Sequence, residues 1–136
     1  MVVATTKVAD LLSTRDRARL AGVHPDLVAV VEAARRQVPF IVVEGLRTRE
    51  RQAQLVKSGA SRTMDSRHLT GLAVDIAPTV DGEVRFDWPL FYPLAKAMKD
   101  AAMARGIALV WGGDWPKFRD GPHFELNRDA YPMGSG

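Results

Sequence analysis

The sequence contains no cysteine, and this absence limits how the protein can be held together. A disulfide framework is excluded, and a metal ion could be bound only through histidine and carboxylate side chains. Long apolar runs are also missing, and no stretch approaches the roughly 18 residues that a membrane span needs. We therefore expect no stable membrane insertion. The N-terminus lacks the basic and apolar regions of a secretion signal, so we expect the protein in the cytoplasm of the cell that makes it.

Runs of basic residues are missing too, although the chain carries a formal net charge of +3 and a sequence pI near 9.6. There is no glycine-aromatic RNA-binding signature and no paired-cysteine finger, so we expect no nucleic-acid partner. The mildly basic surface instead favours anionic partners such as cell-wall polymer or lipid headgroups.

The size and composition are those of one soluble domain. The chain has 136 residues, of which 46% are hydrophobic and 26% charged, enough to bury a core without disulfides. It has no internal repeat and no low-complexity linker, so we expect a single domain over residues 1–136, without a separate binding domain and acting as a monomer.

Helix-start signals mark the first part of the chain. Ser13 followed by Asp16 predicts a helix that runs to about Gly22. His24 before Pro25 is typical of a cap on a second helix, so His24 is interpreted as structural and not as a ligand. That helix has an apolar stripe, made of Leu27, Val30, Val31 and Ala34.

A strand is predicted at Phe40 to Val43, and Thr48 then caps a helix to Lys57 with Ala53, Val56 and Leu55 facing inward. Ala60 to Asp65 is expected to be a loop. The remaining elements are expected as strands at 73–77 and 107–111, a hairpin turn at Asp81-Gly82, a helix from Trp88 to about Arg105, and a strand that starts at His123. Together they predict an α+β fold in which a small antiparallel sheet carries the functional residues and helices cover its other face.

Two short stretches far apart in the sequence supply the candidate site. His68 and Asp75 lie in the first stretch and His123 in the second, and two of the three histidines in the chain are in this set. Two neutral imidazoles and a carboxylate suit Zn2+ and leave a fourth position for water, which is the arrangement of a catalytic site. Gly71 can break the strand regularity that would otherwise place His68 and Asp75 on opposite faces. The alternative for Asp75 is a hydrogen-bonded aspartate of the core.

Two further residues are candidates for catalysis. Asp120 lies in the turn before His123, from which it can reach a metal-bound water without binding the metal. Arg47 lies at a strand-to-helix junction, although a solvated surface role is the alternative for that arginine. Ser66 is a candidate hydrogen-bonding residue near the ligands. Candidates for the cleft lining, each with a structural role as the alternative, are Trp111, Asp114 and Phe124.

The motif Ser66-x-His68-x-x-Gly71-x-Ala73-x-Asp75, followed by Asp120-x-Pro122-His123-Phe124-Glu125, resembles the D-Ala-D-Ala metallopeptidase family of LAS-type zinc peptidases. Gly45-Leu46-Arg47-Thr48, with Gln52 and Gly59, is similar to the arginine motif of that family. The resemblance covers about residues 27–126. In size and in its Asp120-x-x-His123 pair, the chain is most similar to the L-alanyl-D-glutamate endopeptidases that serve as bacteriophage endolysins.

The resemblance implies that His68, Asp75 and His123 bind zinc, that Asp120 is the catalytic base and acid, and that Arg47 stabilises the oxyanion. Family members often have glutamate at the position of Asp120. Many also have tyrosine at the position of Leu46, so a substrate contact is expected to be missing there.

The leading hypothesis is thus a zinc-dependent peptidoglycan peptidase that uses metal-activated water to hydrolyse the L-alanyl-D-glutamate bond of murein stem peptides, after release onto the cell wall. One alternative is a D-Ala-D-Ala carboxypeptidase or dipeptidase. Another is a non-catalytic, zinc-containing wall-binding module, and a metal-free domain is the third.

Overall fold

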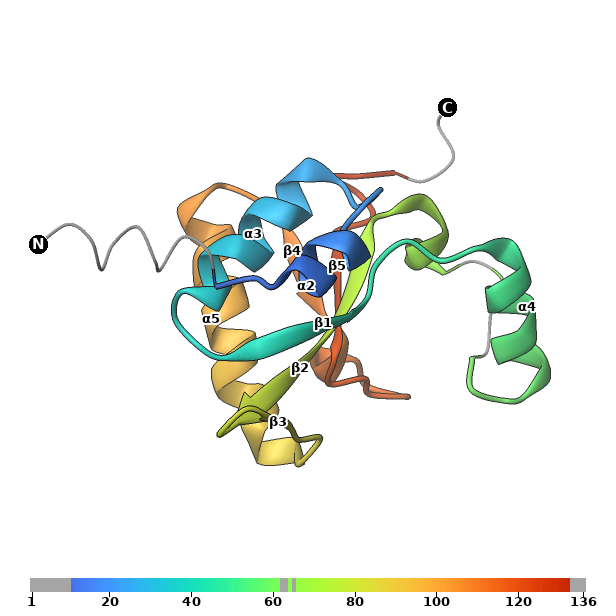
Figure 1. The fold of residues 1–136 in the computed structure, drawn as a ribbon. Helices are drawn as coiled ribbons and strands as arrows, with labels where there is room; N and C mark the ends of the chain where they lie inside the picture. Colours follow the sequence, from blue (N-terminus) through green and yellow to red (C-terminus); the bar gives the residue numbers. More distant parts are fainter. Residues whose placement is uncertain (1–10, 62–63, 65, 133–136) are drawn as a thin grey trace, which may run out of the picture.

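Residues 11–61, 64 and 66–132 are described in a computed structural model of the chain (Figure 1). The predictions for the N-terminal signal region and for positions 62, 63 and 65 of the expected loop concern residues outside this range. Among the described residues, no helix has the length and apolar character needed to cross a membrane.

Three helices begin at the predicted caps, whereas the helix predicted from Trp88 begins three residues later, after a 3-10 turn. The helices are α2 (Thr14–Arg19), α3 (Pro25–Arg35), α4 (Arg49–Lys57) and α5 (Phe91–Ala104), with 3-10 turns η1 (Arg67–Thr70), η2 (Trp88–Leu90) and η3 (Gly112–Asp114). Ser13 and Asp16 form a reciprocal capping box on α2. The Nδ1 atom of His24 accepts a hydrogen bond from the first turn of α3 at 3.0 Å, which confirms the structural role predicted for that histidine.

One antiparallel sheet contains the strands in the order β1-β2-β5-β4, and β3 pairs with β2 outside that path. The strands are β1 (Phe40–Glu44), β2 (Ala73–Val80), β3 (Glu83–Val84), β4 (Leu109–Trp111) and β5 (His123–Leu126). Asp81 and Gly82 both have positive φ angles, of 52° and 82°, as a two-residue hairpin turn requires. The predicted hairpin is therefore confirmed, whereas β4 begins two residues later than expected.

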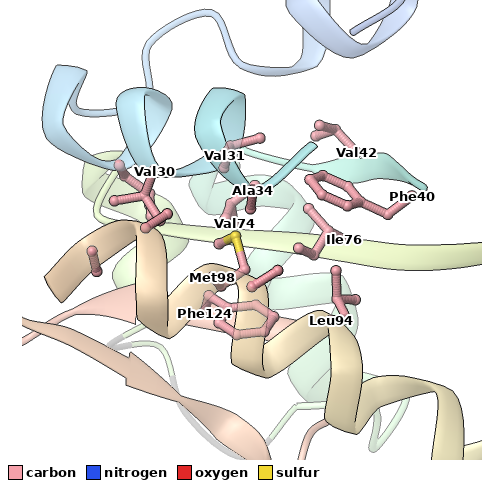
Figure 2. Packing of buried hydrophobic residues seen from close by; sticks show 14 of the residues in the cluster. Val30, Val31, Ala34, Phe40, Val42, Val74, Ile76, Leu94, Met98 and Phe124 are labelled. Carbon is pink, nitrogen blue, oxygen red and sulfur yellow. The ribbon is translucent and has the colours of Figure 1, made fainter. Parts of the chain in front are cut away.

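The hydrophobic core lies between one face of the sheet and the helices α3 and α5 (Figure 2). Val42, Ile76 and Phe124 enter it from three neighbouring strands. The helices contribute the predicted stripe of α3 and, from α5, Leu94 and Met98, which are also almost fully buried.

Because side chains alternate along a strand, the residues next to these core positions lie on the other face of the sheet. Asp75 lies between Val74 and Ile76 on β2, and His123 and Glu125 flank Phe124 on β5. The helices thus cover one face and the polar residues occupy the other, as expected. The α+β prediction is confirmed.

The prediction for α4 is wrong in detail. Ala53 is exposed, Leu55 and Val56 are only partly buried, and Gln52 is the buried residue of this helix. Figure 1 shows α4 on the side of the molecule away from α3 and α5, beyond the end of β1. The helix therefore buries a polar side chain at the edge of a cleft instead of an apolar face in the core.

Candidate metal centre

Strand pairing places three polar residues side by side on one face of the sheet. Glu44 of β1 is the register partner of Asp75 on β2, and Asp75 is the partner of His123 on β5. The register shifts between Val42 and Glu44, which is the irregularity of a β-bulge, and bulges often redirect side chains beside functional sites.

His68 reaches the same place from η1 and not from a strand. The hydroxyl of Ser66 caps this short helix by accepting a hydrogen bond from the backbone of His68 at 3.2 Å. Gly71 ends the helix in the left-handed conformation, with φ of 74°, and the chain then enters β2. The break predicted at Gly71 is therefore what allows His68 and Asp75 to face one another.

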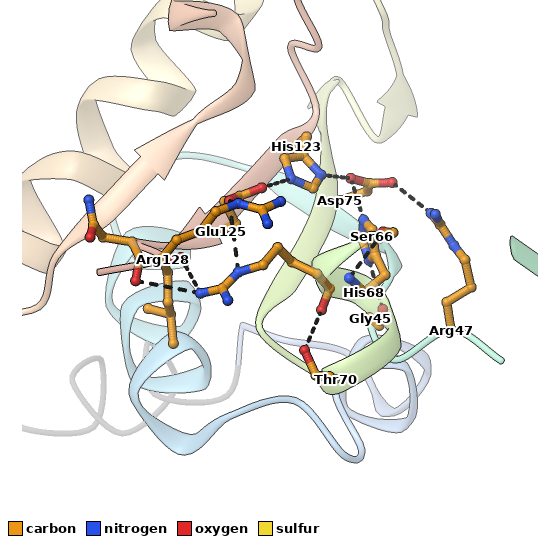
Figure 3. A network of polar contacts seen from close by, with 12 residues as sticks. Gly45, Arg47, Ser66, His68, Thr70, Asp75, His123, Glu125 and Arg128 are labelled. Atoms are coloured by element: carbon orange, nitrogen blue, oxygen red, sulfur yellow. Dashed lines mark hydrogen bonds and ion pairs between the residues drawn. The ribbon is translucent and has the colours of Figure 1, made fainter. Parts of the chain in front are cut away.

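The two imidazoles converge on a single carboxylate oxygen (Figure 3). Nε2 of His68 lies 3.2 Å and Nδ1 of His123 lies 3.3 Å from Oδ1 of Asp75. One ligand atom from each residue falls within 4.8 Å of the others, which is close enough for all three to bind one ion. The structure thus brings together the three residues predicted as metal ligands.

The hydrogen bonds of His68 determine which of its two ring nitrogens can bind a metal ion. Its Nδ1 lies 2.8 Å from the backbone carbonyl of Gly45, which can only accept, so Nδ1 carries the hydrogen. In the neutral ring, Nε2 then presents a lone pair toward the Asp75 carboxylate.

His123 has the same arrangement with its two nitrogens exchanged. Nε2 lies 2.8 Å from a carboxylate oxygen of Glu125, so it donates a hydrogen bond there and leaves the Nδ1 lone pair facing Asp75. Two lone pairs and a carboxylate oxygen therefore meet, and such a set of acceptors calls for a cation. His, His and Asp suit zinc, so the residues present fit the predicted ion.

Without an ion, a proton takes the place of the cation. Burial disfavours a charged imidazole, but hydrogen bonds to Asp75 and Glu125 outweigh it and raise the pKa of His123 to about 9. Burial likewise opposes the charge of Asp75, yet hydrogen bonds from His123 and His68 hold the pKa of that carboxyl well below its ordinary value. The site is therefore built to stabilise positive charge between its ligands.

Arg47 lies at the edge of this group, where the alternative of a solvated side chain is wrong. Its side chain is 9% exposed and lies 3.7 Å from Asp75. Glu44 accepts a hydrogen bond from Nη2 at 2.5 Å, and Gln52 accepts one from Nη1 at 2.7 Å. Two side chains thus fix the guanidinium beside Asp75, at the edge of the ligand set.

Asp120 lies in the turn before β5. Burial and the negative charge of Asp75 raise the pKa of the Asp120 carboxyl above its ordinary value. A raised pKa suits a group that must both accept and return a proton. The turn is fixed by the backbone of Gly112, where an added Cβ would lie 2.5 Å from the Asp120 carbonyl oxygen.

These residues line one open cleft of about 740 Å3. Its lining includes Arg47, His68, Asp75, Asp120 and His123, which are all the residues predicted to bind metal or act in catalysis. It also includes side chains from α4 and from the segment 115–118.

Three weaker predictions for the cleft lining are wrong. Trp111 is buried and donates a hydrogen bond to the Gly121 carbonyl at 2.7 Å, and Phe124 is fully buried on the core face. Asp114 forms an exposed ion pair with Lys99. Trp111 and Phe124 thus belong to the core and Asp114 pairs with a lysine of α5, and none of the three is among the residues that line the cleft.

The sequence profile of the phage L-alanyl-D-glutamate peptidases matches residues 9–131. The chain belongs to this family. The predicted resemblance is thereby confirmed.

Among solved structures, the chain is similar to the L-Ala D-Glu endopeptidase ChiX of Serratia marcescens, with a TM-score of 0.85 and 46% identity over 89% of this chain and 92% of that one. Two curated phage relatives are also named L-alanyl-D-glutamate peptidase. The protein of Listeria phage A118 is 40% identical over 69% of this chain, and that of Escherichia phage T5 is 36% identical over 85% of it.

The lengths of these relatives differ. The match spans 32% of the Listeria phage protein but 88% of the T5 protein. The similarity to the T5 protein therefore extends over nearly all of that relative, whereas the Listeria phage protein is about three times as long as its matched part.

Sequence reasoning missed the residues that contact His123 on the side away from Asp75. Glu125 accepts the hydrogen bond from His123 and is only 5% exposed. Arg67 lies 3.8 Å and Arg128 lies 3.5 Å from the other oxygen of Glu125, and Arg67 is almost fully buried. The signal that could have found Glu125 is its position two residues after His123, because i and i+2 share one face of a strand. No comparable pattern marks Arg67.

Proposed function

We propose that this protein is a metal-dependent peptidase that hydrolyses the L-alanyl-D-glutamate bond of peptidoglycan stem peptides. The observation that carries the proposal is the convergence of two imidazole lone pairs on the Asp75 carboxylate, in an open cleft that also contains Asp120. The identity of the cleaved bond is inferred from the names of three relatives, which describe peptidases acting between L-alanine and D-glutamate.

Zinc is the ion that the donor set favours, held by His68, Asp75 and His123. When bound, such an ion supplies Lewis-acid chemistry to water and to a peptide carbonyl. The protein fixes the ligand tautomers through the Gly45 carbonyl and Glu125, so each imidazole offers the correct nitrogen.

Asp120 moves the proton. Its carboxylate takes a proton from the water whose oxygen attacks the scissile carbonyl carbon, and then gives that proton to the amine nitrogen as the C–N bond breaks. The products are a new carboxyl terminus on alanine and a new amino terminus on D-glutamate, so atoms and charge balance.

Arg47 stabilises the negative oxygen that develops on the attacked carbonyl. Glu44 and Gln52 hold the guanidinium in place before substrate arrives, so little reorganisation is needed during the reaction. A cation fixed in advance beside the ligands is the arrangement that such a transition state requires.

The test is mass spectrometry of purified murein after digestion with the metal-loaded protein, its chelated form, and the variants Asp120→Asn and His123→Ala. We expect new D-glutamate amino termini with the loaded protein and none with the other three. Release of D-alanine or its dipeptide would instead indicate a carboxypeptidase or dipeptidase. Absence of any product from protein that retains its metal would support a binding module.

A further inference from the structure

The two ends of the candidate metal centre have different chemical surroundings. At one end, the ring of Trp115 packs against that of His123 with centroids 5.1 Å apart. At the other end, the guanidinium of Arg47 lies 3.7 Å from Asp75. His123 and Asp75 are themselves in contact. An aromatic ring therefore approaches the ligand set at His123, and a cationic group approaches it at Asp75.

The aromatic end is extended by Phe118, which lines the same cleft and is 64% exposed. Large apolar side chains exposed at the edge of a cleft commonly mark a surface that a ligand covers. Lys117, between the two aromatic residues in sequence, also lines the cleft and adds a hydrogen-bond donor.

The backbone at Phe118 is in an uncommon conformation. Its φ angle is 54°, in the left-handed region that a bulky side chain seldom adopts. Conformations of this kind cost energy, and they cluster at sites that contact ligands. The turn thus holds an aromatic ring at the mouth of the cleft despite a conformational cost.

The cationic end is formed by α4. Arg51, in the first turn of α4, is exposed and lines the same cleft as Arg47. Guanidinium groups bind carboxylates through paired hydrogen bonds, so this wall suits the portion of a substrate that carries free carboxylates.

A stem peptide has the same asymmetry. Its D-glutamate side carries carboxylates, whereas its L-alanine is joined through an uncharged lactyl amide to an amino sugar of the glycan strand. Sugar rings stack their C–H faces on aromatic rings, and their acetamide and hydroxyl oxygens accept hydrogen bonds from a lysine.

We propose that Phe118, with Trp115 and Lys117, forms a subsite for the amino sugar that carries the stem peptide, while Arg51 faces the carboxylates beyond the cleaved bond. This inference rests on the proposed function and extends it to the glycan. The bound substrate runs from the aromatic wall across the ligands to α4, and the protein discriminates glycan-linked from free peptide at Phe118.

The test compares two soluble substrates of the metal-loaded protein, a disaccharide-tripeptide and the same tripeptide without sugar. We expect Phe118→Ala to lower kcat/KM for the disaccharide-tripeptide by roughly fivefold to tenfold, the size of one aromatic contact. The value for the free tripeptide should change less than about twofold. Phe118→Trp should retain the preference because it keeps a ring at that position.

Phe86→Ala is the matched control, since Phe86 is 60% exposed and is not among the residues that line the cleft. It should leave both substrates unaffected. An equal loss on both substrates, or no loss on either, with Phe118→Ala would overturn the sugar subsite. Failure of the unaltered protein to cleave either substrate between L-alanine and D-glutamate would contradict the proposed function instead, so the two failures are distinguishable.

Discussion

Glu125 accepts a hydrogen bond from Nε2 of His123 at 2.8 Å, on the ring nitrogen that does not face Asp75. This contact fixes which nitrogen of His123 carries a hydrogen, so it determines whether the other is free to bind metal. The two arginines beside Glu125 keep the carboxylate charged, and hydrogen bonding from His123 lowers the pKa of Glu125 in spite of its burial.

Replacing Glu125 should therefore weaken metal binding although Glu125 is not a ligand. We expect Glu125→Ala to lower zinc affinity by about 10-fold to 100-fold, measured by competition with a chromophoric chelator. Glu125→Gln should lower zinc affinity less than Glu125→Ala does, because the glutamine amide oxygen still accepts the hydrogen bond from His123. Glu83→Gln, on the exposed strand β3, is the control and should bind as the unaltered protein does. Unchanged affinity in Glu125→Ala would contradict this role.

Metal binding should release a proton. The pKa of His123 in the metal-free protein is about 9, so this imidazole is protonated near neutral pH and must lose the Nδ1 hydrogen to bind an ion. Zinc affinity should rise roughly tenfold per pH unit between about pH 7 and pH 9 and level off above that range. Calorimetry at about pH 7.5 in buffers of different ionisation enthalpy should show close to one proton released. An enthalpy independent of buffer would contradict the assignment.

Arg47 should be needed for the reaction and not for the metal. We expect Arg47→Lys to lower kcat by about 100-fold to 1000-fold. The single ammonium group of lysine cannot reproduce the planar guanidinium whose two nitrogens donate to Glu44 and Gln52. Metal content, measured by atomic absorption, should stay at that of the unaltered protein. Arg49→Lys, in the exposed first turn of α4, provides the control. Loss of metal in step with activity would show that Arg47 supports the ligands instead.

Gly45 should tolerate no side chain. A Cβ at this position would lie 2.2 Å from the carbonyl oxygen of Arg19 and 2.7 Å from the Val23 side chain. Gly45→Ala should destabilise the protein by about 1–3 kcal/mol in denaturant unfolding, and it should weaken zinc binding by displacing the carbonyl that orients His68.

Gly82→Ala separates these two effects on unfolding and metal binding. Gly82 has a positive φ of 82°, but an added Cβ there meets nothing within 4 Å. The variant should lower stability through its backbone alone and leave zinc affinity unchanged. Equal zinc affinity in Gly45→Ala and the unaltered protein would show that His68 is held without the Gly45 carbonyl.

Prediction from sequence succeeded where local chemistry is decisive. Ser13, His24 and Thr48 are caps because their side chains satisfy first-turn N–H groups, and this requires no knowledge of the rest of the chain. The ligand set was recognisable because few residue types bind zinc and the chain contains only three histidines. The roles of Asp120 and Arg47 in the reaction stay predictions.

Prediction was poorer where the answer depends on distant neighbours. Gln52 is buried because Arg47 and Ser61 bind it, whereas Ala53 next to it is exposed, and helical spacing alone favoured the alanine. Arg67 is almost fully buried because the Leu126 carbonyl, 59 positions later, accepts its hydrogen bond at 2.7 Å. Local pattern carries no information about such a partner.

Strand β5 lies between β2 and β4 although it is the last strand of the sheet in the sequence. A ribosome must therefore complete residues 123–126 before the two halves of the sheet can join, and those four residues bring both His123 and Glu125. A nascent chain that stops short of them has neither a closed sheet nor a full ligand set.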